Sequence, residues 1–136
     1  MFIITIVRQV LLPLLRRRFD MKKGIFSENK VKLIRSVERE FEMFKYKKLS
    51  GSRQSIFDSC NEIRFYSCIY EYFQYSDNIR EEHIRACLNC GGDVIATLYC
   101  VYMDTEYLRY SRWEDIEEIL NVLVREQDKY RVLEGI

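Results

Sequence analysis

The chain has 136 residues, of which 48% are hydrophobic and 32% are charged. This is the composition of one folded domain and it excludes an intrinsically disordered chain. A single proline and five glycines are too few for an all-β domain, which needs a turn roughly every 8–12 residues. We therefore expect an all-α fold, a compact bundle of about five helices joined by short loops.

The net charge of +1 conceals an uneven distribution along the chain. Residues 1–20 carry four Arg and one Asp (+3), residues 21–53 carry ten Lys or Arg and four Glu (+6), and residues 54–136 carry eight Lys or Arg and sixteen Asp or Glu (−8). Because a field of one sign attracts partners of the other, this polarity favours contact between the two ends or two surfaces for different partners. Ordinary solvated helix faces are the alternative.

Residues 1–20 contain no acidic residue before Asp20, unlike the rest of the chain. Met21-Lys22-Lys23 is typical of the first residues of a bacterial protein. The hypothesis is that residues 1–20 are an N-terminal extension of doubtful status and that 21–136 form a single helical domain. The alternative is an amphipathic anchor with Arg16–Arg18 at lipid headgroups, so a membrane is a partner only if residues 1–20 are native. An odd set of five cysteines and the absence of a recognisable secretory leader favour the cytoplasm.

The first predicted helix begins after Ser27 and continues to Leu49. Its inward-facing positions recur at steps of three and four: Val31, Ile34, Val37, Phe41, Phe44 and, at its end, Lys48 with the adjoining Leu49. Ser50-Gly51-Ser52 ends this helix, and Ser52 can cap a second one that continues to about Ser76.

A short helix is predicted over residues 79–90, with Asn78 and Glu81 as a capping box and a stop at Gly91-Gly92. Asp93 is expected to cap a fourth helix over residues 94–103. Ser111 and Glu114 form a further capping box, which opens a last helix whose Trp113 and following aliphatic side chains should face inward.

Ten tyrosines are unusual for this length, and many of them flank acidic stretches. Tyrosine offers a large contact area with a polar tip at a small entropic cost, so a surface of tyrosines and carboxylates is a predicted protein-binding face. Half-buried helix packing is the alternative. The predicted surface comprises Tyr66, Tyr70, Tyr75, Tyr102, Tyr107, Tyr110, Glu114, Glu117 and Glu118.

A second hypothesis is a small zinc-binding regulator. His83, Cys87 and Cys90 lie at i, i+4 and i+7, on one face of the predicted helix, and imidazole and thiolate suit zinc. Cys100 on the next helix could complete a tetrahedral set. The alternative is that these thiols are small buried hydrophobic side chains, since free cysteine is among the most buried residues.

A third hypothesis is a nucleic-acid binder that uses the basic helix of residues 22–48 to neutralise phosphates. Its candidate contacts are Lys30, Lys32, Arg35, Lys45, Lys47 and Lys48. Glutamates interrupt this run, which favours a solvated helix with ion pairs between neighbouring turns.

We find no catalytic residues and no phosphate-binding loop, so neither an enzyme nor a cofactor is expected. The segment from Ser55 to Phe73, SIFDSCNEIRFYSCIYEYF, is followed by a short helix, a turn and Asp93-Val-Ile-Ala-Thr-Leu-Tyr99. This pattern resembles small helical proteins of unknown function from Firmicutes and their phages and conjugative elements, over about residues 35–124. The resemblance implies an accessory or regulatory protein of a mobile element, some of which inhibit host defence nucleases by binding them. The expected partner is another protein.

Overall fold

The structure, a computed structural model, describes residues 28–131. The predicted extension of residues 1–20 therefore lies outside the described residues. Every regular element between residues 28 and 131 is helical, which confirms the all-α prediction. In chain order these are α3 (Glu28–Leu49), α4 (Arg53–Asp58), α5 (Cys60–Tyr75), α6 (Glu81–Asn89), α7 (Val94–Asp104), α8 (Trp113–Arg125) and the single turn α9 (Gln127–Tyr130).

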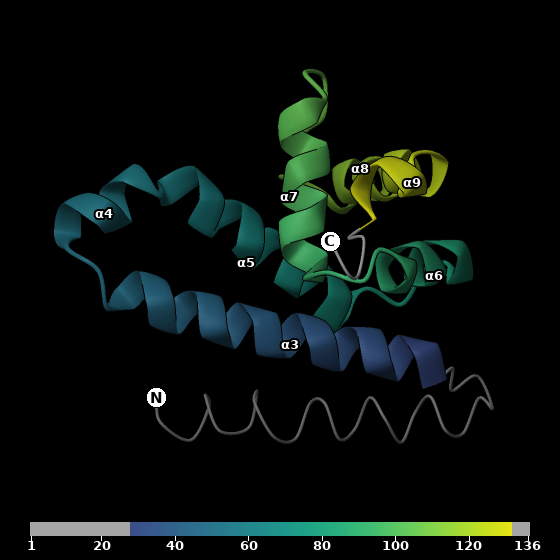
Figure 1. Cartoon of the computed structure of the whole chain (residues 1–136), viewed down its shortest axis with the longest axis horizontal. Helices are drawn as coiled ribbons and strands as arrows, with labels where there is room; N and C mark the ends of the chain where they lie inside the picture. The colour runs from purple at the N-terminus through teal and green to yellow at the C-terminus, as the bar shows by residue number, and fades with distance from the viewer. Residues whose placement is uncertain (1–27, 132–136) are drawn as a thin grey trace.

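The long helix α3 is the platform of the fold. It contacts α5, α6 and α7, while α8 packs on α6 and α7. Figure 1 shows α3 along one edge, α7 crossing it steeply, and α6, α8 and α9 gathered at the end opposite α4. The axes of α6 and α7 differ by 97° across a short turn. These two consecutive helices are therefore nearly perpendicular.

The core lies between α3, α5, α6, α7 and α8. Its largest fully buried side chains are Leu33, Phe65, Ile69, Tyr72, Phe73, Ile84, Ile95, Leu98, Ile116, Ile119, Leu120 and Leu123. On α3 the inward stripe consists of Leu33 and Val37, which are fully buried, followed by the half-buried Phe41 and Phe44. The prediction is confirmed for Val37, Phe41 and Phe44, which lie on the one face that contacts the other helices. It missed Leu33, and the predicted Val31 and Ile34 are only half-buried at the edge of that face.

Of the two residues expected at the end of that stripe, Leu49 is exposed, which corrects the prediction, whereas Lys48 is half-buried beside Phe44. The next helix begins as expected, since the Ser52 hydroxyl accepts a hydrogen bond from the Ser55 backbone N–H at 3.1 Å. The predicted single helix to Ser76 is interrupted at Ser59, which separates α4 from α5. There the Ser59 N–H is shared between the carbonyls of Ser55 and Ile56, a tightened last turn that ends a short helix.

The N-terminus of α7 is capped from outside the helix. Asp93 occupies the predicted N-cap position, but it makes no side-chain capping bond within residues 28–131. Instead the Glu40 carboxylate of α3 accepts from the backbone N–H groups of Ile95 at 2.7 Å and Ala96 at 2.9 Å. These two bonds satisfy donors that a helix leaves unpaired at its first turn, and they attach α7 to α3.

The start of α8 also differs from the expected one. The N-cap is Arg112, whose backbone N–H donates to the Asp115 carboxylate at 3.2 Å, so the helix begins one residue after the predicted Ser111–Glu114 box. Trp113 is 45% exposed, which corrects the expectation that it faces inward. Its ring contacts Tyr72 edge-on, with centroids 6.1 Å apart, so only part of the indole is covered.

Candidate interaction surface

The predicted tyrosine and carboxylate surface divides into a packed part and an exposed part. Tyr66 is buried against Phe44, with ring centroids 3.8 Å apart, and Tyr70 stacks on Phe41 at 4.4 Å. Burial raises the pKa of both phenols above the ordinary value. Tyr66 is therefore a core residue and cannot form a binding surface.

Phe65 is the centre of the remaining aromatic packing. The half-buried rings of Tyr99, Tyr102 and Tyr110 surround it, with centroids 5.1–5.3 Å away. Such stacked and edge-on pairs stabilise a core beyond their buried area, by about 0.5–1.5 kcal/mol each. Tyr102 and Tyr110 thus belong mainly to the packing of α5, α7 and the segment before α8.

Five members of the predicted surface remain. Tyr75, Tyr107, Glu114 and Glu118 are exposed and Glu117 is half-buried. They come from the end of α5, the connection after α7 and two turns of α8. The sequence identified the tyrosines as unusual, but it did not show that most of them pack between helices.

The four predicted zinc ligands do not come together as one site. His83, Cys87 and Cys90 are all buried on or just after α6, whereas Cys100 is exposed on α7. Within residues 28–131 no group of three or more His, Cys, Asp or Glu side chains is arranged to hold a metal ion. Burial raises the pKa of the Cys87 thiol well above the ordinary range, which opposes the thiolate form that zinc requires.

His83 has a structural partner. One ring nitrogen, Nε2, lies 2.7 Å from the Asn121 side-chain oxygen of α8, while Nδ1 has no hydrogen-bond partner among residues 28–131. The His83–Asn121 bond fixes α6 against α8, two helices that also pack through aliphatic side chains. This histidine therefore acts as a partly satisfied polar group of the core.

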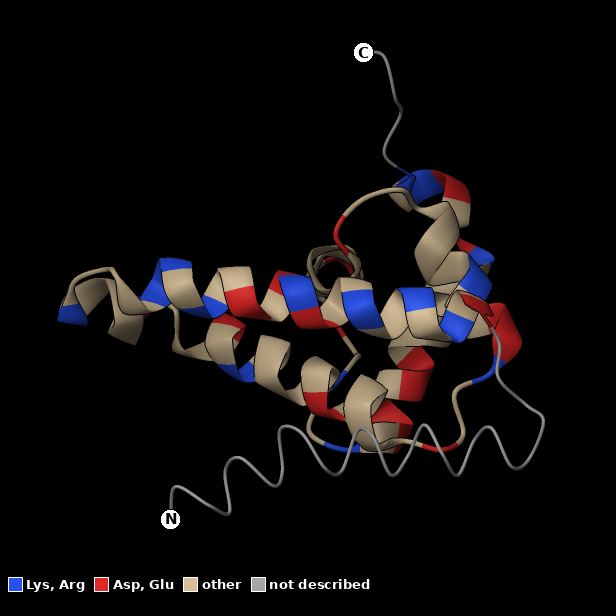
Figure 2. Ribbon diagram, turned by 90° about the horizontal axis from the view of Figure 1, so that it is seen from below, with Lys and Arg blue, Asp and Glu red and all other residues tan. Residues whose placement is uncertain are grey.

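The basic residues proposed to contact nucleic acid do not form a continuous cationic face. Lys45 pairs with Glu42 at 3.0 Å, and Lys48 pairs with Glu62 at 3.5 Å and donates to the Ser59 hydroxyl. Figure 2 shows Lys and Arg bands along α3 alternating with Asp and Glu bands. Two of the six predicted phosphate contacts thus form ion pairs with carboxylates of the same chain, and a third, Lys30, is half-buried.

A different surface is more distinctive, and the sequence reasoning missed it. Four large apolar side chains are strongly exposed at the end of the molecule formed by α3 and α4: Met43 (69%), Tyr46 (81%), Leu49 (72%) and Phe57 (72%). We call this set the apolar end patch. Figure 1 shows that α4 and the adjoining end of α3 project away from α6, α8 and α9.

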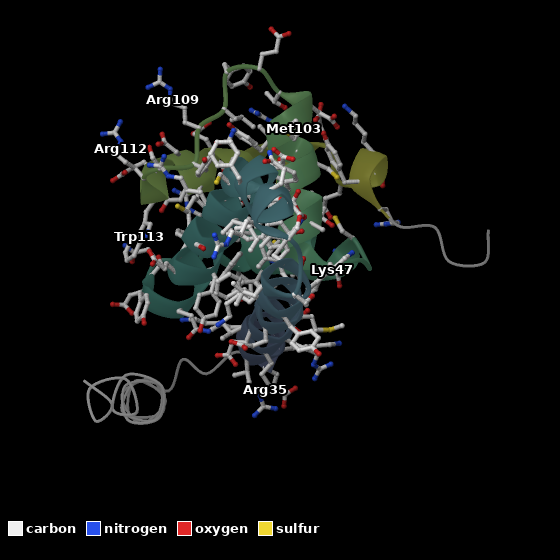
Figure 3. All side chains as sticks on the ribbon, turned by 90° about the vertical axis from the view of Figure 1, so that its left-hand side faces the viewer. Arg35, Lys47, Met103, Arg109, Arg112 and Trp113 are labelled. Carbon is white, nitrogen blue, oxygen red and sulfur yellow. The ribbon has the colours of Figure 1, made fainter. Side chains whose placement is uncertain are left out.

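Three cationic side chains lie on the outer side of α3, separated from the apolar end patch by Glu42. Lys32, Arg35 and Arg39 are exposed, and in Figure 3 the Arg35 side chain points away from the other helices. The spacing could have revealed this face: Lys32, Arg35, Arg39, Glu42, Tyr46 and Leu49 recur at alternating steps of three and four on the side opposite Leu33 and Val37. Charged residues opposite the buried stripe are usual for an amphipathic helix; the apolar Tyr46 and Leu49 at its C-terminal end are not.

No family model, curated protein or solved structure matches this chain significantly. Within residues 28–131 no single helix combines the length and the hydropathy needed to cross a bilayer; α6 and α7 reach that hydropathy only as a pair bent by 97°. The proposal for function therefore depends on the surface itself.

Proposed function

We propose that the protein is a non-enzymatic interaction module that binds another protein through the outer face of α3 and the apolar end patch. The observation that carries this proposal is the exposure of Met43, Tyr46, Leu49 and Phe57, at 69–81% each, at one end of the fold. Single exposed hydrophobic residues are common on protein surfaces, but four large ones this exposed on two consecutive helices favour an interaction site.

The patch has the composition of a binding surface. Tyrosine, phenylalanine and methionine are enriched at the centres of interfaces, whereas lysine and arginine at the rim tune orientation and rate of association. Met43, Tyr46 and Leu49 are three residues apart and therefore neighbours on one helix. Lys47 and Arg53 are exposed at the same end of the fold. A partner that buries the apolar side chains and offers carboxylates would match this face.

A regulatory role in the cytoplasm, as an accessory protein of a mobile element, is part of the same proposal. The family resemblance described above supports it, as do the five cysteines, all of which are free thiols. Free thiols persist in a reducing compartment. The exposed Cys60 and Cys100 would otherwise be prone to oxidation.

Affinity capture with surface variants tests this proposal. The tagged full-length chain is compared with a Tyr46→Ser/Phe57→Ser variant, in host extract, by quantitative mass spectrometry. The matched control is Met103→Ser, which removes a large apolar side chain that is 62% exposed on α7, outside both proposed binding faces. A partner retained by the wild type and the control and lost with the patch variant supports the proposal. Equal recovery by all three chains would overturn it.

A further inference from the structure

We infer that the outer face of α3 binds the same face of a second copy of this chain, in an antiparallel pair related by a two-fold axis. This inference rests on the proposed function, because it names the first partner of the proposed interaction surface. It is drawn from the order of charges and apolar side chains along α3.

The outer positions of α3 follow a heptad pattern. Lys32, Arg35, Arg39, Glu42, Tyr46 and Leu49 alternate in steps of three and four, and all six are exposed. This spacing places the six on one face of the helix. Four of them are charged and two are apolar, so a facing helix would pair with them mainly through charge. The opposite side of the helix holds Leu33, Val37 and Phe44 against the core. The second stripe is therefore available to another helix, and no described helix of the same chain covers it.

An antiparallel copy matches every position of this stripe. When the two-fold axis passes between Arg39 and Glu42, Arg39 of one copy faces Glu42 of the other and the pair occurs twice. A facing guanidinium and carboxylate can form a charge-assisted pair with two hydrogen bonds. The centre of the stripe is thus complementary to itself, which is the requirement for a symmetric dimer interface.

The same axis pairs the flanking residues favourably. Arg35 faces Tyr46 of the other copy, and arginine stacks well on an aromatic ring. Lys32 faces Leu49 of the other copy, where the aliphatic part of the lysine side chain can cover the leucine and leave the ammonium group in water. The most exposed apolar side chain of the patch, Tyr46, is covered in this arrangement.

Other arrangements of two α3 helices are less favourable. A parallel pair would place Lys32, Arg35 and Arg39 each against its own copy, and like charges across a helix interface are destabilising. An antiparallel pair shifted by one heptad toward the N-terminus would bring Arg35 against Arg39 twice. It would still pair Lys32 with Glu42, but it would place Tyr46 against Glu28 and leave Leu49 beyond the end of the facing helix. A shift in the other direction would bring Arg39 against Leu49 and lose the ion pair with Glu42. Charge and apolar matching therefore select one register.

The expected dimer is weak. A 22-residue helix is about 33 Å long at 1.5 Å per residue, and one pair of helices buries less than the standard interface of roughly 800 Å² per partner. We expect a dissociation constant in the range of roughly 10–100 µM. The central ion pairs should make it increase with salt concentration.

Sedimentation equilibrium of the full-length chain, from roughly 1 to 500 µM, tests this inference. Arg39→Glu alone and Glu42→Arg alone each place like charges at the centre, and each should raise the dissociation constant at least about tenfold. The double variant R39E/E42R exchanges the charges on both copies and should restore the constant to within about threefold of the wild type. Glu71→Arg reverses an exposed carboxylate on α5 and serves as the control that leaves it unchanged.

The outcomes separate this inference from the proposed function. All substituted side chains are exposed, and circular dichroism at each concentration verifies that the variants remain folded. A wild-type chain that stays monomeric throughout, or a double variant that fails to recover, overturns the self-association. If the chain stays monomeric while Tyr46→Ser/Phe57→Ser still loses a captured partner, self-association fails and the proposed function stands. If Arg39→Glu and Glu42→Arg keep the dimer and Tyr46→Ser/Phe57→Ser keeps its captured partner, both the self-association and the proposed function are overturned.

Discussion

Removal of the Glu40 carboxylate should weaken the protein more than the loss of any other acidic side chain on α3. Glu40→Ala leaves the backbone N–H groups of Ile95 and Ala96, which now donate at 2.7 and 2.9 Å, without an acceptor. It also removes a negative charge from the positive end of the α7 dipole. Both effects destabilise the folded state.

The size of the effect follows from these two bonds. A hydrogen bond to a charged group stabilises a protein by about 1.5–3 kcal/mol when it is buried, and the loss of a helix N-cap costs about 0.5–2 kcal/mol. Because Glu40 is partly exposed, water can replace some of the lost interaction. We expect Glu40→Ala to lower the free energy of unfolding by about 2–4 kcal/mol. Glu40→Gln keeps one acceptor oxygen and should lose about half as much.

The Glu40 carboxylate should also make the stability of the protein depend on pH. Burial raises the pKa of Glu40 to about 6 from its ordinary 4.5, so between these values the folded chain binds more protons than the unfolded chain. The stabilisation from this group is therefore fully present below about pH 4.5 and is lost as the pH rises through about 6. A shift of 1.5 units corresponds to about 2 kcal/mol, which partial exposure reduces to about 1 kcal/mol.

Urea unfolding followed by circular dichroism measures these quantities. It is carried out at low protein concentration, so that self-association does not contribute. Glu71→Ala removes an exposed carboxylate from α5 and should change the free energy of unfolding by less than about 0.5 kcal/mol. From about pH 7.5 to 4.5, the wild type should gain about 1 kcal/mol relative to Glu40→Gln. The reasoning is refuted if Glu40→Ala is no less stable than Glu71→Ala.

Three further predictions concern the core and its thiols. Phe44→Ala removes a half-buried ring stacked 3.8 Å from Tyr66, and calorimetry should show a loss of about 2–3 kcal/mol; a change below about 1 kcal/mol would contradict this packing. His83→Ala leaves a cavity between α6 and α8, and denaturant unfolding should show a loss of about 2–4 kcal/mol, with no stabilisation of the wild type by added zinc. A thiol reagent should modify the exposed Cys100 in the native protein and the buried Cys87 only after unfolding, so equal rates for the two would be inconsistent with the fold.

The sequence predicted local structure well where local rules decide it. The stripe of Val37, Phe41 and Phe44 and the cap at Ser52 both depend on residues within a few positions, and both are found in the structure. The interruption at Ser59 was not predicted, because the apolar period continues through it. The start of α8 was predicted one residue too early. Two acidic residues, Glu114 and Asp115, could each complete a capping box, and the sequence does not show which one does.

Long-range features were beyond sequence reasoning. Nothing near Glu40 indicates that it caps a helix more than fifty residues later, since the bond depends on where α7 crosses α3. The tyrosines illustrate the same limit. A half-apolar side chain at the edge of a stripe is either buried or exposed, and the choice depends on the neighbouring helix. Tyr66 is covered by Phe44 of α3. Tyr46 lies on the outer side of α3, where no described helix covers it, and is exposed.

The platform role of α3 has a consequence for biosynthesis. This helix leaves the ribosome before α6 and α7, and the Glu40–Ile95 bond joins residues separated by 55 positions. Until those later helices are made, the inner stripe of α3 lacks part of its cover, and exposed apolar surface on a nascent chain invites aggregation. Fragments that stop before Val94 should therefore depend on chaperones, and slow translation of residues 50–93 should lower the yield of native protein.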